Sequence, residues 1–226
     1  MTSSFRDLLA SLLPQDVKFA AGGIRDAPRD MFASEELAIS RAVEKRRHEF
    51  SAGRAYARLA LAACGCTPQP IPVGADRRPV WPKGYVGSIS HSDRLCAAVA
   101  SRAERYAGLG LDTESDASLP ADLRDMVCRP EERFGPVPPG CDLAKMLFVA
   151  KEAVFKAYYP ITEVFLDFHD VAVKLIPARC SFEAVFVRRQ ISQPSNRRLL
   201  GRIGTADSHV VAVVAIAPTD LAEIGS

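Results

Sequence analysis

Long apolar runs are missing from this 226-residue sequence. The longest extends only from Val210 to Ala217, well short of the ~20 residues that a membrane-spanning helix needs. Near the N-terminus, Arg6 and Asp7 interrupt the only stretch that resembles the core of a signal peptide, residues 5–13. We therefore expect no membrane association and a cytoplasmic location.

Neither the cysteines nor the net charge indicates a zinc finger or a nucleic-acid binder. Of the six cysteines only Cys64 and Cys66 are close together, and no histidine lies near them, so we expect free thiols. The net charge is only +2, which argues against a protein dedicated to nucleic acid. Basic residues are nevertheless concentrated in one segment, residues 45–58.

Predicted helices and strands are mixed without the regular alternation of parallel α/β folds, so we predict an α+β fold. One long helical pattern extends over residues 34–63, and a second begins at the N-cap Asp142 and ends before Pro160. In the first, the core-facing stripe would be Ile39, Val43, Phe50, Ala57 and Leu61. Strands are predicted at 87–91, 95–101, 108–114, 182–189, 199–203 and 210–217.

Asp112 and Glu114 follow the apolar residues 109–111 in one predicted strand. Residues i and i+2 of a strand point to the same face, so the two carboxylates would converge about 7 Å apart along the backbone. Such carboxylates repel each other unless a cation lies between them, and magnesium prefers oxygen ligands and substrate phosphates. The alternative is an ordinary solvated strand end.

Glu152 and Lys156 are at i and i+4 of the second predicted helix and therefore share a face. An exposed pair of this kind is usually a surface ion pair of little energetic value. Here the aromatic residues Phe148, Phe155 and Tyr159 flank the pair, which favours a lined cleft over open solvent. A further carboxylate and a lysine suit phosphate chemistry, where a metal and a cation share the developing charge.

Two other features are suited to bind anions. His91 ends the predicted strand 87–91 among small hydroxyl residues, although a bond to nearby backbone is the simpler explanation of this histidine alone. Arg47, Arg54 and Arg58 recur at i, i+7 and i+11 and would form a row of forked phosphate donors. The alternative for the row is a solvated helical face.

Taken together, these elements resemble the 4'-phosphopantetheinyl transferase superfamily, in the monomeric type that serves surfactin, enterobactin and related synthetases. The resemblance covers about residues 40–160, and the Trp81-Pro82 pair is most similar to the enterobactin branch. The matching segments are KRRHEF (45–50), GRAYAR (53–58), residues 73–82, GSISH (87–91), GLDTE (110–114) and KEAVFK (151–156).

The resemblance implies two similar α/β lobes in a pseudo-twofold arrangement, with the active site in the cleft between them. Residues 1–107 would form the N-terminal lobe, which contacts the nucleotide of coenzyme A. Residues 108–226 would form the C-terminal lobe, with the metal and catalytic residues. The implied enzyme is a holo-carrier-protein synthase. It would transfer 4'-phosphopantetheine from coenzyme A to a serine of an apo-acyl or peptidyl carrier protein and release 3',5'-ADP.

The implied cofactor is Mg²⁺, or Mn²⁺ in its place, and the implied partners are carrier proteins of fatty-acid, polyketide or nonribosomal peptide synthetases, including those of siderophore biosynthesis. Asp112, Glu114 and Glu152 would bind the metal. Glu152 would also help to deprotonate the serine, Lys156 would stabilise the leaving group, and His91 would assist. The residues expected to contact coenzyme A are Arg47, Arg54, Gly74, Arg77, Ser90, His91, Asp112, Lys151 and Lys156.

The resemblance implies that different residues of this set contact different parts of coenzyme A. Arg47, Arg54 and His91 would hold the 3'-phosphate, residues 74–77 would pass the adenine, and Lys151 would lie close to the phosphates. Two other function classes stay open at this point. A metal-dependent nuclease uses the same acids and lysine but needs a broad basic surface. A non-catalytic module would bind carrier protein or nucleotide only.

Overall fold

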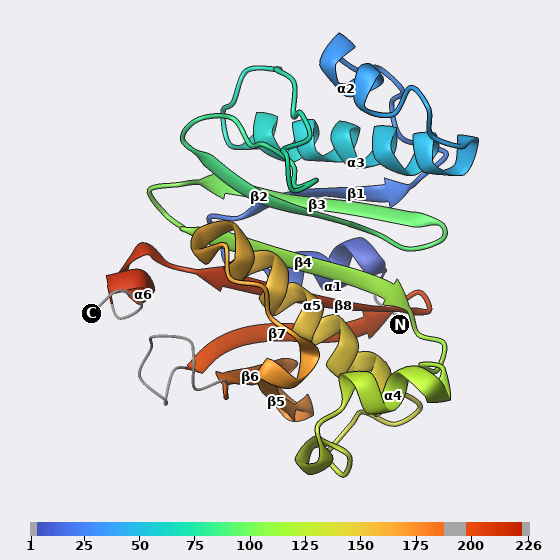
Figure 1. Ribbon diagram of the computed structural model, residues 1–226, viewed down its shortest axis with the longest axis vertical. Helices are drawn as coiled ribbons and strands as arrows, with labels where there is room; N and C mark the ends of the chain where they lie inside the picture. Colours follow the sequence, from blue (N-terminus) through green and yellow to red (C-terminus); the bar gives the residue numbers. More distant parts are fainter. Residues whose placement is uncertain (1–3, 188–197, 223–226) are drawn as a thin grey trace.

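This computed structural model describes residues 4–187 and 198–222. These residues form two antiparallel sheets, and a helix of 20 residues covers each sheet (Figure 1). The first sheet has the order β1-β3-β2 and carries α3 (Glu44–Ala63) on one face. The second has the order β4-β8-β7-β6-β5 and carries α5 (Leu143–Thr162). The predicted α+β fold with two similar lobes is confirmed.

The strands of the first sheet are β1 (Lys18–Gly23), β2 (Tyr85–His91) and β3 (Leu95–Arg102). Those of the second are β4 (Gly108–Ser115), β5 (Val171–Ile176), β6 (Ser181–Phe186), β7 (Arg198–Ala206) and β8 (His209–Ile216). The shorter helices are α1 (Phe5–Leu12), α2 (Ala33–Ala38), α4 (Ala121–Val127) and α6 (Pro218–Ala222). Within the described ranges no helix is both long and apolar enough to cross a bilayer.

The core between the two sheets is shared by both lobes. α1 packs against β7 and β8 of the second sheet, although the first lobe was expected to include it. Its side chains Phe5 and Leu9 join Val99 of β3 and Leu111 of β4 in one buried cluster. The two sheets therefore share no strand ladder among the described residues but are continuous in packing, and the division at residue 107 remains a prediction.

Strands β2 and β4 lie side by side at the junction of the lobes without forming a ladder (Figure 1). Instead, Ser88 Oγ accepts a hydrogen bond from Leu111 N at 3.0 Å, and Ser90 Oγ accepts one from Thr113 N at 3.1 Å. Buried amides need hydrogen-bond acceptors, and here two serine hydroxyls take the place of the backbone carbonyls that a neighbouring strand would otherwise provide. We call this pair of contacts the serine seam.

The predicted helix over residues 34–63 is wrong as one element, because the chain turns between α2 and α3. Glu35 of α2 is fully buried, and its carboxylate accepts hydrogen bonds from Ile71 N and from the Arg58 side chain. This long-range anchor fixes α2 across α3 and leaves Val43, a predicted core residue, exposed at the α3 N-cap. Gly53 does not interrupt α3; it admits the Ile89 side chain, which a Cβ would approach to 3.1 Å.

Helix α5 begins at the predicted N-cap, since Asp142 accepts a hydrogen bond from Lys145 N at 2.9 Å. The predicted end at Pro160 is wrong: the helix continues to Thr162 and closes at Glu163 in the left-handed region, with φ 56°. A proline this near the end removes only one intrahelical bond. The strand predicted at 182–189 ends at Phe186, and its last two residues lie outside the described part. Strand β5 was not predicted at all.

Candidate active site

One pocket of about 200 Å³ at the lobe junction gathers most of the predicted catalytic and metal-binding side chains. β2 contributes Ser90 and His91, β4 contributes Asp112 and Glu114, and α5 contributes Glu152 and Lys156, together with Ile89 and Phe148. The alternation of β4 and the i, i+4 spacing on α5 place these groups on one side of each element, as the sequence predicts.

Asp112 is the centre of this pocket's hydrogen-bond network. Its Oδ1 accepts from Lys156 Nζ at 2.6 Å and from Ser90 Oγ at 2.9 Å, and Lys156 Nζ lies 3.2 Å from the same hydroxyl. The side chain is 4 % exposed, so the charges are little screened by water. Ser90 therefore belongs both to this network and to the serine seam, and it ties the pocket to the lobe junction.

The pKa values of the other two carboxylates of the pocket are both raised from their ordinary value. Burial raises the pKa of Glu114, and the charge of Asp112 raises it further, while Lys145 and Lys156 act in the opposite direction. Burial also raises the pKa of Glu152, with Asp112 the next contributor. Three acids thus share a site that contains one contacting ammonium group, that of Lys156.

The donor set fits a hard divalent cation. Asp112 Oδ2 is buried and has no hydrogen-bond partner among the described residues, and Glu114 and Glu152 add carboxylate oxygens to the same pocket. An unpartnered buried carboxylate oxygen is costly unless a charge compensates it. The side chains as they stand, however, do not form a preassembled cluster of three metal-ligating residues anywhere in the described ranges.

His91 lies at the mouth of the pocket between opposite charges. Its Nε2 is 3.4 Å from Arg46 Nη1 and 3.9 Å from Glu49 Oε2. Burial lowers the pKa of His91; Glu49 opposes that shift, and Arg46 and Lys156 add to it. A neutral imidazole keeps one N–H to donate to an anion, as the resemblance implies.

The three arginines of the predicted row, all on α3, are not equivalent. Arg58 is paired with the buried Glu35, and Arg54 is buried beneath Phe50 with its Nε donating to Ile71 O at 2.7 Å. Burial lowers the pKa of Arg54 to about 10. Arg47 is exposed and makes only long contacts, at 3.4 and 3.5 Å, to backbone carbonyls. The predicted row of solvent-facing donors thus reduces to Arg47, with Arg54 held behind it.

Lys151 is placed away from the position expected for a phosphate contact. Its Nζ donates to Glu132 Oε2 at 2.7 Å, to Val127 O at 2.8 Å and to Phe168 O at 2.9 Å, so all three hydrogens are used inside the fold. Glu132 in turn accepts from Val173 N at 2.6 Å. No local sequence pattern pairs Lys151 with Glu132, because the two residues are 19 positions apart.

Residues 64–84, between α3 and β2, contain five prolines and form what we call the proline-rich loop; Gly74 and Arg77 lie on a tight turn within it. Gly74 N donates to Arg78 O at 2.8 Å and Arg77 N to Gly74 O at 2.9 Å, inside an isolated bridge between Val73 and Pro79. Arg77 is exposed and has φ 68°. Neither residue lines the catalytic pocket, and their predicted contact with the adenine remains a prediction.

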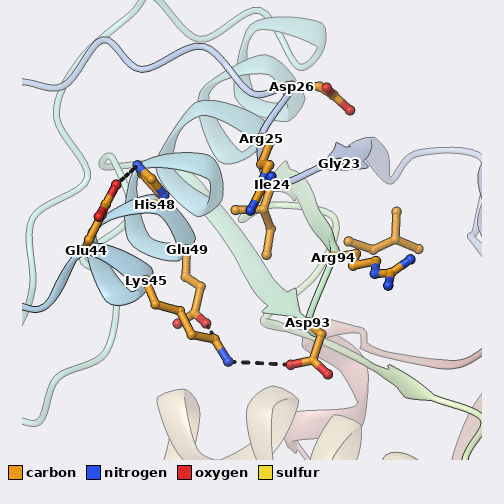
Figure 2. A pocket seen from close by; sticks show the side chains of 11 residues that line it. Gly23, Ile24, Arg25, Asp26, Glu44, Lys45, His48, Glu49, Asp93 and Arg94 are labelled. Atoms are coloured by element: carbon orange, nitrogen blue, oxygen red, sulfur yellow. Dashed lines mark ion pairs between the residues drawn. The ribbon is translucent and has the colours of Figure 1, made fainter.

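Two further cavities adjoin the site. An apolar one of about 300 Å³ shares Glu152 with the catalytic pocket and is lined by Phe155, Phe165 and Leu166 among others, which agrees with the expectation of an aromatic-lined cleft beside Glu152. A larger groove of about 1130 Å³ lies at the outer edge of the first lobe. Figure 2 shows two ion pairs among its charged residues, Lys45 with Asp93 and His48 with Glu44.

Comparison with known proteins gives matches that cover both lobes. A family model described as the 4'-phosphopantetheinyl transferase N-terminal domain matches residues 34–101, and one described as the 4'-phosphopantetheinyl transferase superfamily matches residues 108–214. The second includes all three acids and the lysine of the catalytic pocket.

Individual relatives extend the match over nearly the whole chain. 4'-Phosphopantetheinyl transferase Svp of Streptomyces mobaraensis is 36% identical over 231 residues, covering 96% of this chain and 92% of its own. 4'-Phosphopantetheinyl transferase Npt of Nocardia iowensis is 37% identical over 170 residues, covering 74% and 76%. Enterobactin synthase component D of Escherichia coli strain K12 is 36% identical over 142 residues, covering 59% and 66%. The chain belongs to the 4'-phosphopantetheinyl transferase superfamily.

Proposed function

We propose that this transferase moves the 4'-phosphopantetheine arm of coenzyme A onto a serine hydroxyl of an apo-carrier protein and releases 3',5'-ADP. The observation that carries the proposal is the convergence of Asp112, Glu114, Glu152 and Lys156 in one pocket at the lobe junction, inside the region that the family model matches. Carrier proteins of fatty-acid, polyketide or nonribosomal peptide synthetases are the proposed partners.

In the proposed reaction the serine oxygen bonds to the phosphorus that carries pantetheine. The bond from that phosphorus to the bridging oxygen breaks, and the bridging oxygen leaves on 3',5'-ADP. Glu152 accepts the serine proton, directly or through water, and its raised pKa makes it a stronger base than an ordinary carboxylate. Lys156 places its ammonium where the leaving phosphate gains negative charge.

Asp112, Glu114 and Glu152 would hold Mg²⁺, or Mn²⁺ in its place. When bound, the ion neutralises diphosphate charge and favours departure of the leaving group. Lys156 Nζ lies 2.6 Å from Asp112 Oδ1, so its ammonium is already beside the carboxylates that are proposed to hold the metal. His91 and Arg47 are proposed to hold the 3'-phosphate, and Arg54 to support that surface from behind.

A direct test is to incubate the protein with coenzyme A, magnesium and several purified apo-carrier proteins, and to follow each carrier by mass spectrometry. The expected result is a mass gain of one phosphopantetheine group on one serine, abolished by chelator and by Asp112→Asn. Lys174→Met, on the exposed edge strand β5, serves as the matched control and should leave transfer intact. A nuclease or a binding module predicts no modified carrier under any condition, and such a result across all carriers would refute the proposal. Monomeric state and cytoplasmic location remain predictions.

A further inference from the structure

The proline-rich loop of the first lobe reaches across the junction through one side chain, that of Arg78. Its Nη1 donates to Tyr159 O at 3.4 Å, and its guanidinium carbon lies 4.9 Å from the centre of the Tyr159 ring. Its Nη2 lies 3.6 Å from Glu163 Oε1, and its Nε pairs with Asp76 in its own loop. One arginine therefore makes a hydrogen bond, a cation–π contact and two ion pairs.

The end of α5 is built to receive this arginine. Tyr159 O belongs to the last turn of the helix, and Glu163 follows in the left-handed conformation that closes α5. The Tyr159 ring stacks on Phe155 with centroids 5.1 Å apart, and Phe155 lines the apolar cavity that also contains Glu152. The loop is thus connected by direct contacts to the helix that carries Glu152 and Lys156.

The other attachments of the loop lie within its own lobe. Ile71, at its base, donates its N–H to Glu35 and receives Arg54 Nε on its carbonyl. Among ion pairs of the described residues, Arg78 with Glu163 is the one that joins residues 4–107 to the second lobe. Without the Arg78 side chain, the tip at residues 74–78 would keep its anchored base but lose the contacts to Tyr159 and Glu163.

We propose that Arg78 is a positioning residue for the nucleotide end of coenzyme A, which acts by clamping the 72–80 loop to the end of α5. This rests on the proposed function, because that loop is the predicted neighbour of the adenine. Arg78 acts through Tyr159 and Glu163 in this scheme and not by contact with a phosphate. Loss of the clamp should therefore weaken nucleotide binding while turnover at saturating coenzyme A is preserved.

The test measures binding of 3',5'-ADP by titration calorimetry in the presence of magnesium, which needs no carrier protein. Arg78→Ala should raise Kd about 3- to 10-fold, the size of one cation–π contact plus a partly exposed ion pair. Arg78→Lys should recover only part of this, because a lysine lacks the planar fork. Arg105→Ala, which removes an exposed arginine paired with Asp16 in the same lobe, is the control and should bind like wild type.

Glu163→Gln separates positioning from direct contact. If Arg78 positions the loop, this variant also weakens 3',5'-ADP, and the double variant is no weaker than Arg78→Ala alone. If Arg78 grips a phosphate itself, Glu163→Gln binds as well as wild type or better, and the proposal is overturned. Unchanged binding by Arg78→Ala, or a loss in kcat without a change in KM, also overturns it.

Failure of the proposed function gives a different pattern. A wild-type protein that binds 3',5'-ADP but modifies no carrier would refute the transfer reaction and leave the clamp supported by the binding series. The opposite result is that the wild-type protein modifies carriers and that Arg78→Ala and Glu163→Gln have the same KM for coenzyme A as wild type. This result would refute the clamp and leave the transfer reaction standing. If the wild-type protein neither binds 3',5'-ADP nor modifies any carrier, both proposals fall.

Discussion

Replacing Lys151 with methionine tests whether this lysine belongs to the fold or to the ligand. In wild type its side chain is 2 % exposed and its ammonium is paired with Glu132, whose carboxylate also accepts from Val173 N and Arg129 N. Methionine keeps the unbranched apolar stem, so the change removes the charge and its three hydrogen bonds without opening a large cavity. What remains is a buried carboxylate without a cation and two carbonyls, of Val127 and Phe168, without this donor.

The expected cost follows from those groups. Breaking a buried ion pair by removing one partner costs about 3–5 kcal/mol. The two backbone amides that still reach Glu132 should keep the loss near the lower end, about 3 kcal/mol. For a chain of this size, each kcal/mol lowers Tm by roughly 2–4 °C, so we expect a fall of about 6–12 °C. Coenzyme A KM, measured well below both transitions, should change less than about twofold, because Lys151 makes no phosphate contact in this arrangement.

Urea and thermal unfolding measure the loss of stability, and carrier-modification kinetics measure the KM for coenzyme A. Lys174→Met, an exposed lysine on β5, is the control and should stay within about 0.5 kcal/mol of wild type. Adding Glu132→Gln to Lys151→Met should restore part of the lost stability, since no unpaired charge is then buried. A folded Lys151→Met protein with unchanged Tm and a KM raised tenfold would show that the lysine binds phosphate after all.

Three further substitutions address the pocket and the phosphate grip. Glu152→Gln should stabilise the metal-free protein at neutral pH. Because the pKa of Glu152 is raised in the folded state, the wild-type protein loses stability as the pH rises from the usual pKa of 4.5 through the folded-state pKa. Glutamine does not titrate, so the variant has no such loss. Thermal unfolding in chelator, measured over a range of pH, should give Tm curves for wild type and Glu152→Gln that meet at acid pH. Parallel curves would contradict the raised pKa of Glu152. Lys156→Ala should lower kcat by about 10²–10⁴ with little change in coenzyme A affinity, and a pure affinity loss would make it a ground-state anchor. Arg47→Ala should cost about 1.5 kcal/mol in coenzyme A binding but nothing with dephospho-coenzyme A, and equal losses for both ligands would refute its assignment to the 3'-phosphate.

Local signals in the sequence were enough to bring the central pocket together. Strand alternation predicts that Asp112 and Glu114 share a face, and helical spacing predicts the same for Glu152 and Lys156; the structure places all four in one pocket. The N-cap of α5 at Asp142 is equally local, because the capping bond joins residues three apart.

Errors arose where a distant partner decides the outcome. The turn after α2 depends on Glu35 reaching Ile71, 36 residues away, and no periodicity reports such a contact. Lys151 and Lys156 look alike on one helix, yet the structure pairs Lys151 with Glu132 inside the fold and Lys156 with Asp112 in the pocket. Strand β5 was within reach of sequence analysis, because the larger apolar residues Val171, Val173 and Leu175 recur at every second position, which is the signal used for the other strands.

The serine seam gives the lobe junction its own spectroscopic probe. The amides of Leu111 and Thr113 are protected by hydroxyls from the opposite lobe, whereas the amides of Gly110 and Asp112 point toward β8, since successive strand amides alternate in direction. Any separation of the lobes would release the first two protons to solvent exchange before the second two. Alternate amides along β4 therefore record two different openings, one of the junction and one of the sheet, in a single hydrogen-exchange experiment.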